Sequence, residues 1–344
     1  MTTTTTTSVL LIGSIPLSSA KEVFLTTSAA LPGRLQDLPD SETGFEATTS
    51  PGRRTASGGR PGERSTWTEI RLWEAVKPSQ YDTAALQSYE IFLRLGDKNA
   101  IPSQTRFQVC LPSPMACVQW HVKPEFHATL EPLYEQRILE ALGVSLAKIP
   151  ASDLAIQWDL CFEIMALEYE RGRISDPLFK PHFLSSSSFF SAKHGILDRI
   201  NRLCEKIPAD VLLGFHFCYG DLGRRHFVEP EDTAVMVDLA NSISKRISRP
   251  VSWVHMPVPR DKDDVGYFEP LRGLDIGDQA QLYLGLVHAG DEEGTKRRIR
   301  TAQAVVSRGF GVATECGLGR MPWDEVESVL RILREVTVPC QKYQ

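Results

Sequence analysis

Short apolar runs alternate with helical patterns along most of this 344-residue chain, and this alternation limits the fold more than any other feature. Seven runs are predicted to be buried strands, at residues 9–12, 107–111, 154–158, 211–217, 251–255, 282–287 and 311–314. Helical patterns lie near residues 20–30, 130–147, 194–206, 230–246, 294–308 and 324–335. Strand–helix repetition of this kind predicts a parallel sheet with helices outside it.

Eight such units would close a (β/α)8 TIM barrel, which we expect to occupy residues 8–338 as a single domain. The eighth strand is expected near residues 68–73. It follows a segment, 44–65, that is mostly Gly, Ser, Thr, Pro and Arg, a composition typical of a flexible surface insertion.

Four further segments are predicted to lack regular structure. Residues 38–44 have the composition of a polar turn after the first helix, and residues 185–190 that of a long lid-type loop. Residues 1–7 and 339–344 are expected to be a disordered lead-in and a tail.

Composition and charge exclude several classes of protein. A net charge of −5 gives no footprint for nucleic-acid binding, and no apolar run approaches the ~20 residues of a membrane-spanning helix. The N-terminus has no basic region of the kind that begins a secretory signal. An odd count of seven cysteines without such a signal predicts a cytoplasmic protein with free or metal-bound thiols. We therefore expect a small-molecule substrate, while the oligomeric state stays undetermined.

A histidine and a cysteine stand two residues apart at the end of one predicted strand. Residues two apart on a strand point to the same face, so the His216 imidazole and the Cys218 thiol should lie side by side. Cys316 follows another apolar strand, and strand ends meet at one mouth of a barrel. One histidine and two cysteines predict a thiophilic metal, with zinc as the first expectation and an open position that is typical of a catalytic site.

The other cysteines carry no such signal. Those in apolar contexts are expected to be small buried side chains: Cys110, Cys117, Cys161 and Cys204.

Polar side chains also fall at other predicted strand ends. Asp159 should face the mouth, where it can bind a substrate amine, orient a metal-bound histidine or form a structural ion pair. Ser14 either binds a carboxylate or bonds its own backbone. His255 is either a fourth metal ligand or a pocket wall, and Glu229 and Glu315 are alternatives for that ligand.

Five segments, taken in order, resemble the catalytic barrel of the cobalamin-independent methionine synthases, a superfamily that includes uroporphyrinogen-decarboxylase-type barrels. Residues 12–16 (IGSIP) resemble the family's IGSFP, residues 114–120 (PMACVQW) its PVTILNW, and residues 156–159 (IQWD) its IQID. Residues 216–219 (HFCY) and 316–318 (CGL) resemble its zinc-binding HxCY and CGL. The chain also resembles single-barrel, methionine-synthase-like proteins of unassigned activity.

The resemblance implies zinc bound by His216, Cys218 and Cys316. In the family a glutamate at the end of the next strand completes the site, whereas the comparable strand here ends at His255, Met256 and Pro257. The resemblance therefore implies that histidine replaces the carboxylate.

The resemblance also implies roles around the substrate. Trp120 corresponds to a tryptophan beside the family's pterin, so it either stacks on a folate-type methyl donor or packs in a loop. His288 lies near the family's acid histidine, at the position of an aspartate, and with Asp159 it is a candidate catalytic group.

Two functions are consistent with these residues. The first is a zinc-dependent methyl or alkyl transferase that activates a small thiol. The alternative is a metal-assisted lyase or decarboxylase acting on a small carboxylate metabolite at the same mouth. A barrel that binds a metabolite without turnover is the third interpretation.

Overall fold

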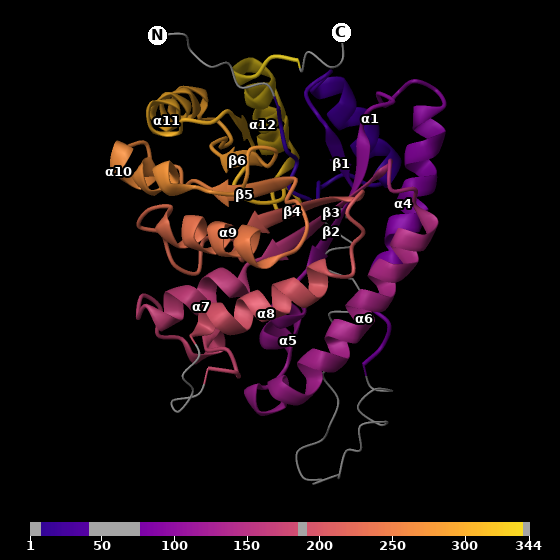
Figure 1. Cartoon of the computed structure of the whole chain (residues 1–344). Helices are drawn as coiled ribbons and strands as arrows, with labels where there is room; N and C mark the ends of the chain where they lie inside the picture. Colours follow the sequence, from indigo (N-terminus) through magenta and orange to yellow (C-terminus); the bar gives the residue numbers. More distant parts are fainter. Residues whose placement is uncertain (1–7, 41–75, 185–190, 340–344) are drawn as a thin grey trace.

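The computed structural model describes residues 8–40, 76–184 and 191–339. Within these residues, seven parallel strands form a single curled sheet in sequence order, and helices surround it (Figure 1). The strands are β1 (Asp37–Pro39), β2 (Arg106–Pro112), β3 (Leu154–Leu160), β4 (Leu212–Phe217), β5 (Trp253–Pro257), β6 (Gln281–Gly285) and β7 (Phe310–Val312).

The helices follow the strands, as the alternation predicts. The α-helices are α1 (Ala20–Ala30), α4 (Tyr81–Gly96), α5 (Pro114–His121), α6 (His127–Lys148), α7 (Phe162–Glu170), α8 (Ala192–Cys204), α9 (Ala234–Arg246), α10 (Val265–Phe268), α11 (Glu292–Val305) and α12 (Trp323–Val336). Short 3-10 helices cover Pro124–Phe126, Pro177–Phe179 and Glu269–Gly273. No helix in the described ranges combines the length and the apolar composition needed to cross a bilayer.

The predicted first strand lies between the two edges of the sheet. Val9 makes isolated parallel bridges to Leu35, just before β1, and to Val312 at the end of β7. The backbone N–H of Leu10 donates to the carbonyl of Val312 at 3.1 Å. The described residues therefore form a curled seven-stranded parallel sheet. Both edges of this sheet contact the segment that contains Val9.

The prediction of a polar turn at residues 38–44 is wrong for its first residues, which belong to a strand. Asp37–Pro39 forms β1, in which Leu38 pairs with Phe107 of β2 and is 1% exposed. Burial of Leu38 and pairing with β2 outweigh the local turn preference of Pro and Asp. The lead-in at 1–7, the insertion at 44–65, the strand at 68–73, the loop at 185–190 and the tail from 340 lie outside the described residues.

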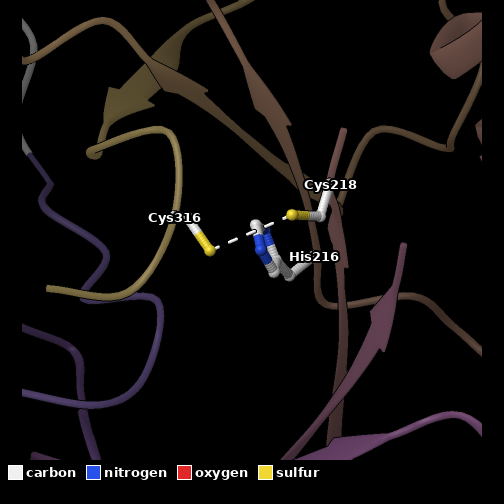
Figure 2. A group of neighbouring side chains, drawn as sticks. All are labelled: His216, Cys218 and Cys316. Atoms are coloured by element: carbon white, nitrogen blue, oxygen red, sulfur yellow. Dashed lines mark hydrogen bonds between the residues drawn. The ribbon is translucent and has the colours of Figure 1, made fainter. Parts of the chain in front are cut away.

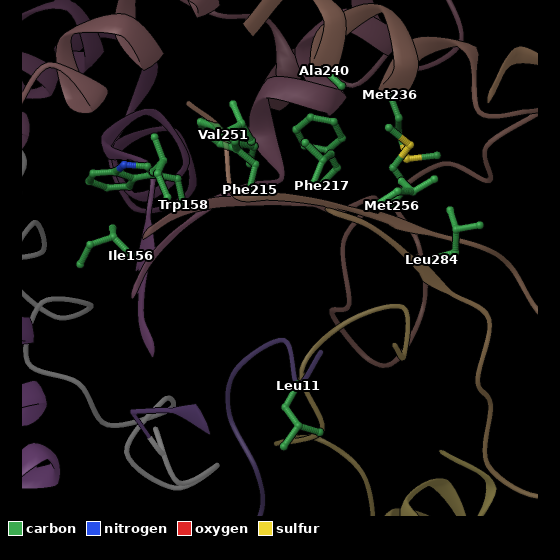
Figure 3. Close-up of a cluster of buried hydrophobic side chains, with 14 of the residues drawn as sticks. Leu11, Ile156, Trp158, Phe215, Phe217, Met236, Ala240, Val251, Met256 and Leu284 are labelled. Atoms are coloured by element: carbon green, nitrogen blue, oxygen red, sulfur yellow. The ribbon is translucent and has the colours of Figure 1, made fainter. Parts of the chain in front are cut away.

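Side chains alternate between the two faces of the sheet. Phe215 and Phe217 point toward the surrounding helices, where they pack in a large apolar core with residues such as Met236 of α9 (Figure 3). A smaller cluster of buried residues forms separately: Leu10, Ile12, Ala155, Trp253, Tyr283 and Ala313. A Cβ built on Gly214 would lie only 1.8 Å from the Trp253 ring, so this position of β4 requires glycine.

Candidate metal centre

Three of the predicted site residues lie side by side on neighbouring strands of the sheet. In the sheet register Asp159 of β3 pairs with His216 of β4, and His216 pairs with His255 of β5. Cys218 follows β4 directly, and Cys316 lies on the segment between β7 and α12. The fold therefore brings five predicted residues, distant in sequence, to the same end of the sheet.

The predicted trio of His216, Cys218 and Cys316 lies together (Figure 2). One ligand atom from each side chain lies within 4.8 Å of the others. The two sulfurs are 3.9 Å apart, and tetrahedral zinc with bonds of ~2.3 Å would hold two sulfurs about 3.5–4 Å apart. His216 and Cys218 are buried and Cys316 is half-buried. The group could therefore bind a metal ion without rearrangement of the backbone.

The environment of the two thiols favours their protonated forms when no cation is present. Contact with Cys161, together with burial, holds the pKa of Cys218 well above its ordinary value, although contact with Cys316 lowers it. Contact with Cys218, followed by burial, raises the pKa of Cys316. The backbone N–H of Gly220 donates to the Cys218 sulfur at 3.3 Å. A cation at this point would supply the missing stabilisation of both thiolates.

His255 lies beside His216 and is not one of the three converging side chains. Its Nδ1 is 2.8 Å from Nδ1 of His216, and its Nε2 donates to the backbone carbonyl of Thr314 at 3.0 Å. Burial, followed by the neighbouring His216, holds the pKa of His255 well below its ordinary value, so the ring is neutral. The other ring nitrogen of His216, Nε2, is buried and has no hydrogen-bond partner among the described residues.

A cavity of about 500 Å³ opens beside the thiols. Its lining includes Cys218, Cys316, His226, His288 and Glu315, together with arginines, further carboxylates and several apolar residues. The wall combines charged and apolar side chains, so the cavity suits a small molecule with both polar and apolar parts next to the two sulfurs.

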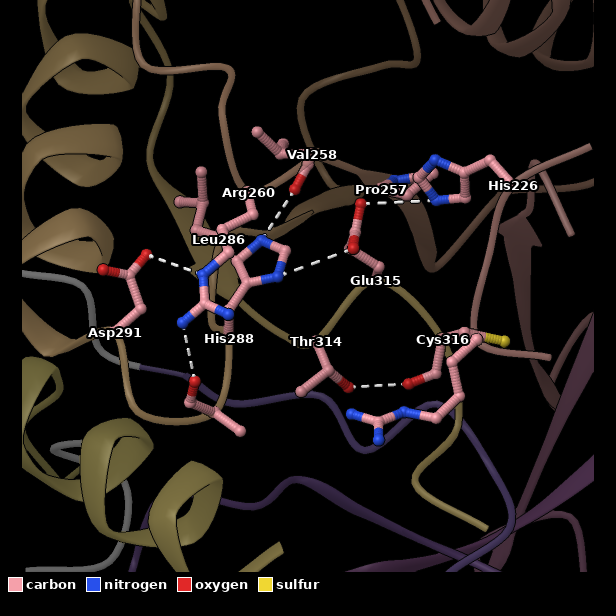
Figure 4. Close-up of polar contacts among 12 residues, drawn as sticks. His226, Pro257, Val258, Arg260, Leu286, His288, Asp291, Thr314, Glu315 and Cys316 are labelled. Carbon is pink, nitrogen blue, oxygen red and sulfur yellow. Dashed lines mark hydrogen bonds and ion pairs between the residues drawn. The ribbon is translucent and has the colours of Figure 1, made fainter. Parts of the chain in front are cut away.

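Glu315 connects two histidines on the cavity wall (Figure 4). Its carboxylate oxygens lie 3.5 Å from His288 Nδ1 and 3.4 Å from His226 Nε2. His288 Nε2 donates to the carbonyl of Val258 at 3.0 Å, and His226 Nδ1 donates to Glu229 at 2.9 Å. Burial, followed by the charge of Glu229, raises the pKa of Glu315 well above its ordinary value. Burial and the nearby Arg298 lower the pKa of His288 to about 3.

His226 is a cavity residue that the sequence patterns do not predict. It lies on the segment between β4 and α9, where no strand or helix pattern marks it. Its only signal is a carboxylate three residues later, Glu229, and such spacing is common on protein surfaces.

The predicted substrate-binding residues lie outside the lining of this cavity. Asp159 is half-buried and accepts a hydrogen bond from Gln157 Nε2 at 2.9 Å. Burial raises the pKa of Asp159 to about 7 despite this bond. Ser14 lies beside the thiol segment, since a Cβ on Gly317 would be 3.1 Å from its Oγ.

Trp120 is 38% exposed and packs against aromatic neighbours. Its ring centroid is 5.9 Å from that of Phe162 and 5.8 Å from that of Phe227. Packing, one of the two predicted roles, therefore accounts for part of its surface, and the exposed part is available to a ligand.

A buried carboxyl on α7 gives a testable pH dependence. Glu163, near the start of α7, is 2% exposed, and burial raises its pKa from 4.5 to about 7. Because its pKa in the folded state is raised, ionisation opposes folding, and stability falls as the pH rises from about 4.5 to 7. We expect Glu163→Gln to remove this loss, which is up to ~3 kcal/mol of unfolding free energy.

Urea unfolding of both proteins at pH 4.5 and pH 8 measures the effect. The stability of Glu163→Gln relative to the native protein should rise between the two pH values, whereas exposed Glu125→Gln should give no such trend. The prediction would be contradicted if the difference in unfolding free energy between Glu163→Gln and the native protein were the same at both pH values.

Comparison with known proteins adds information on the fold. The sequence matches no protein-family model and no curated protein. A putative vitamin-B12-independent methionine synthase from Listeria monocytogenes superposes with a TM-score of 0.50 at 12% identity, over 96% of this chain and 99% of that one. The chain therefore shares the fold of this putative methionine synthase. The resemblance predicted from the order of the motifs is thus confirmed at the level of the fold.

Two other solved structures are also similar. A B12-independent methionine synthase from Shewanella sp. W3-18-1, solved with selenomethionine, gives a TM-score of 0.44 at 15% identity over 70% of this chain. This chain spans 64% of that protein's length. The homocysteine methyltransferase MmuM from Escherichia coli gives a TM-score of 0.37 at 12% identity, over 97% of each chain.

Proposed function

We propose that this protein is a zinc-dependent transferase that moves a methyl or other alkyl group to a small thiol. The observation that carries the proposal is the convergence of His216, Cys218 and Cys316 beside a cavity of about 500 Å³. The name of the structural neighbour from Listeria monocytogenes, a putative methionine synthase, supports methyl transfer to a thiol as the reaction class.

The donor set fits zinc. Two thiols 3.9 Å apart and one buried imidazole nitrogen without a partner match three of the four ligands of a catalytic zinc site. Zinc bound there would lower the pKa of a substrate thiol at the fourth position, so that the thiolate exists near neutral pH.

We propose that the reaction takes place in this cavity. The substrate sulfur would lie beside Cys218 and Cys316 and attack the methyl carbon of the donor. The bond between that carbon and the donor breaks, and the leaving atom takes up a proton. His226 can pass this proton through Nε2, because its other nitrogen, Nδ1, is held by a hydrogen bond to Glu229. His288 stays neutral near pH 7 because of its lowered pKa, so its role is to orient Glu315.

The remaining predicted residues keep proposed roles at the edge of the site. Ser14, beside Gly317, and Asp159, level with His216 in the sheet, are suited to hold the charged ends of the substrate. The exposed part of Trp120 is suited to stack on a folate-type donor. We further propose that the Val9 bridges complete a closed (β/α)8 barrel around these groups.

Metal analysis and a product assay together test the proposal. The purified chain, prepared without chelators, should contain about one zinc ion per molecule by mass spectrometry. Incubation with small thiols and methyl donors, including a methylated folate, should yield the methyl thioether. Protein that neither retains nor takes up a thiophilic metal would contradict the transferase. Release of carbon dioxide from small carboxylates without thioether formation would favour the lyase.

A further inference from the structure

We infer that His255 is a positioning residue that fixes the ring of His216 for metal binding and is not itself a metal ligand. The inference rests on the proposed zinc site. It gives a distinct role to the residue that occupies the place of the family's ligating glutamate.

The hydrogen bonds determine which nitrogens carry protons. A backbone carbonyl only accepts, so the His255 nitrogen that bonds to Thr314 O, Nε2, must carry a proton. In the neutral ring Nδ1 of His255 is then an acceptor, and Nδ1 of His216, 2.8 Å away, must be the donor. A neutral His216 therefore has its lone pair on Nε2, the buried atom without a hydrogen-bond partner. This tautomer leaves the lone pair on Nε2 free for a metal.

The same contacts leave His255 no nitrogen for a metal. Nδ1 is occupied by His216 and Nε2 by Thr314, and the side chain is fully buried. Ligation by His255 would break one of these two bonds and leave the partner without a hydrogen bond in the protein interior, which costs free energy.

His255 also connects the two parts of the chain that carry the proposed ligands. It contacts His216 on β4 and the carbonyl of Thr314, and the Thr314 hydroxyl donates to the carbonyl of Cys316 at 2.7 Å. A histidine that donates to a carbonyl and accepts from a ligating histidine is suited to hold both the imidazole and the thiol segment in place. The metal would then have three protein ligands and one open position for the substrate.

X-ray absorption spectroscopy of the zinc-loaded native protein tests the ligand count. We expect two sulfur ligands, one imidazole and one further light atom. Two imidazoles would overturn the inference while leaving the proposed zinc site intact.

Two substitutions separate positioning from ligation. His255→Leu removes the acceptor for His216 Nδ1, whereas His255→Asn keeps an acceptor at the equivalent side-chain position. In chelator competition we expect zinc affinity to fall about 10- to 100-fold in His255→Leu and less in His255→Asn. Both variants should keep two sulfurs and one imidazole in the absorption spectrum. Loss of an imidazole in His255→Asn, or equal loss of affinity in both variants, would overturn the inference.

His127→Leu is the matched control, because His127 is also buried and bonds to a backbone carbonyl, that of Val122, at 2.8 Å. It should leave zinc affinity unchanged. If His255→Leu does not fold, His255→Asn and the native spectrum still decide between the two roles.

Nitrogen NMR of the metal-free native protein, labelled at histidine, gives a test that needs no zinc. We expect protons on Nδ1 of His216 and Nε2 of His255, and none on the other two nitrogens. The opposite tautomers would overturn the inference. If the expected tautomers are present but the protein binds no metal, the proposed function fails and the orienting contact stands.

Discussion

Replacing Cys218 or Cys316 by serine is expected to reduce zinc affinity by at least ~100-fold and to abolish thiol alkylation. Loss of a group that only orients a ligand costs about 10- to 100-fold in metal affinity, so loss of a ligand should cost more. Serine keeps the size of the side chain but has no thiolate. Zinc content after dialysis, measured by mass spectrometry, gives the result directly.

The fold should survive both changes, because the large apolar core lies between the sheet and the helices and not at the strand ends. Circular dichroism and thermal unfolding check this point. Cys117→Ser, at a half-buried cysteine of α5, is the control and should retain zinc. A full equivalent of zinc in both Cys218→Ser and Cys316→Ser would refute the assigned ligands.

Gly214→Ala is expected to destabilise the protein by about 1–3 kcal/mol, the usual range for overpacking a tight core. The added methyl group would lie 1.8 Å from Cε2 of Trp253 and within 2.3 Å of two further ring atoms. An indole ring is rigid, and Trp253 is only 2% exposed, so the ring can give way only by displacing its buried neighbours. Urea unfolding followed by tryptophan fluorescence measures the loss.

Gly143→Ala is the matched control. Gly143 lies within α6 on its exposed side, and a Cβ there would meet nothing within 4 Å. Alanine in a helix is favoured over glycine, so this variant should be stabilised by about 0.5–1 kcal/mol. The two glycine replacements should therefore have opposite signs. Stabilisation by both would mean that Trp253 does not fill the space beside Gly214.

The sequence determined the elements whose patterns are local. Six strands, β2–β7, and the helix Ala20–Ala30 lie where apolar runs and helical spacing predicted them. The period of two along a strand also set His216 and Cys218 on one face, and the parallel alternation set Cys316 at the same end of the sheet. These features depend on burial patterns within a few residues, which a sequence displays directly.

The tertiary structure decided what depends on distant partners. Asp37–Pro39 becomes a strand through pairing with β2, although its own residues favour a turn. His226 and Glu315 meet at the cavity only after the fold has formed. The contacts that distinguish a ligating histidine from an orienting one join His255 to residues 39 and 59 positions away. Tautomers and hydrogen-bond partners are set by such contacts, so no local pattern in the sequence could have revealed them.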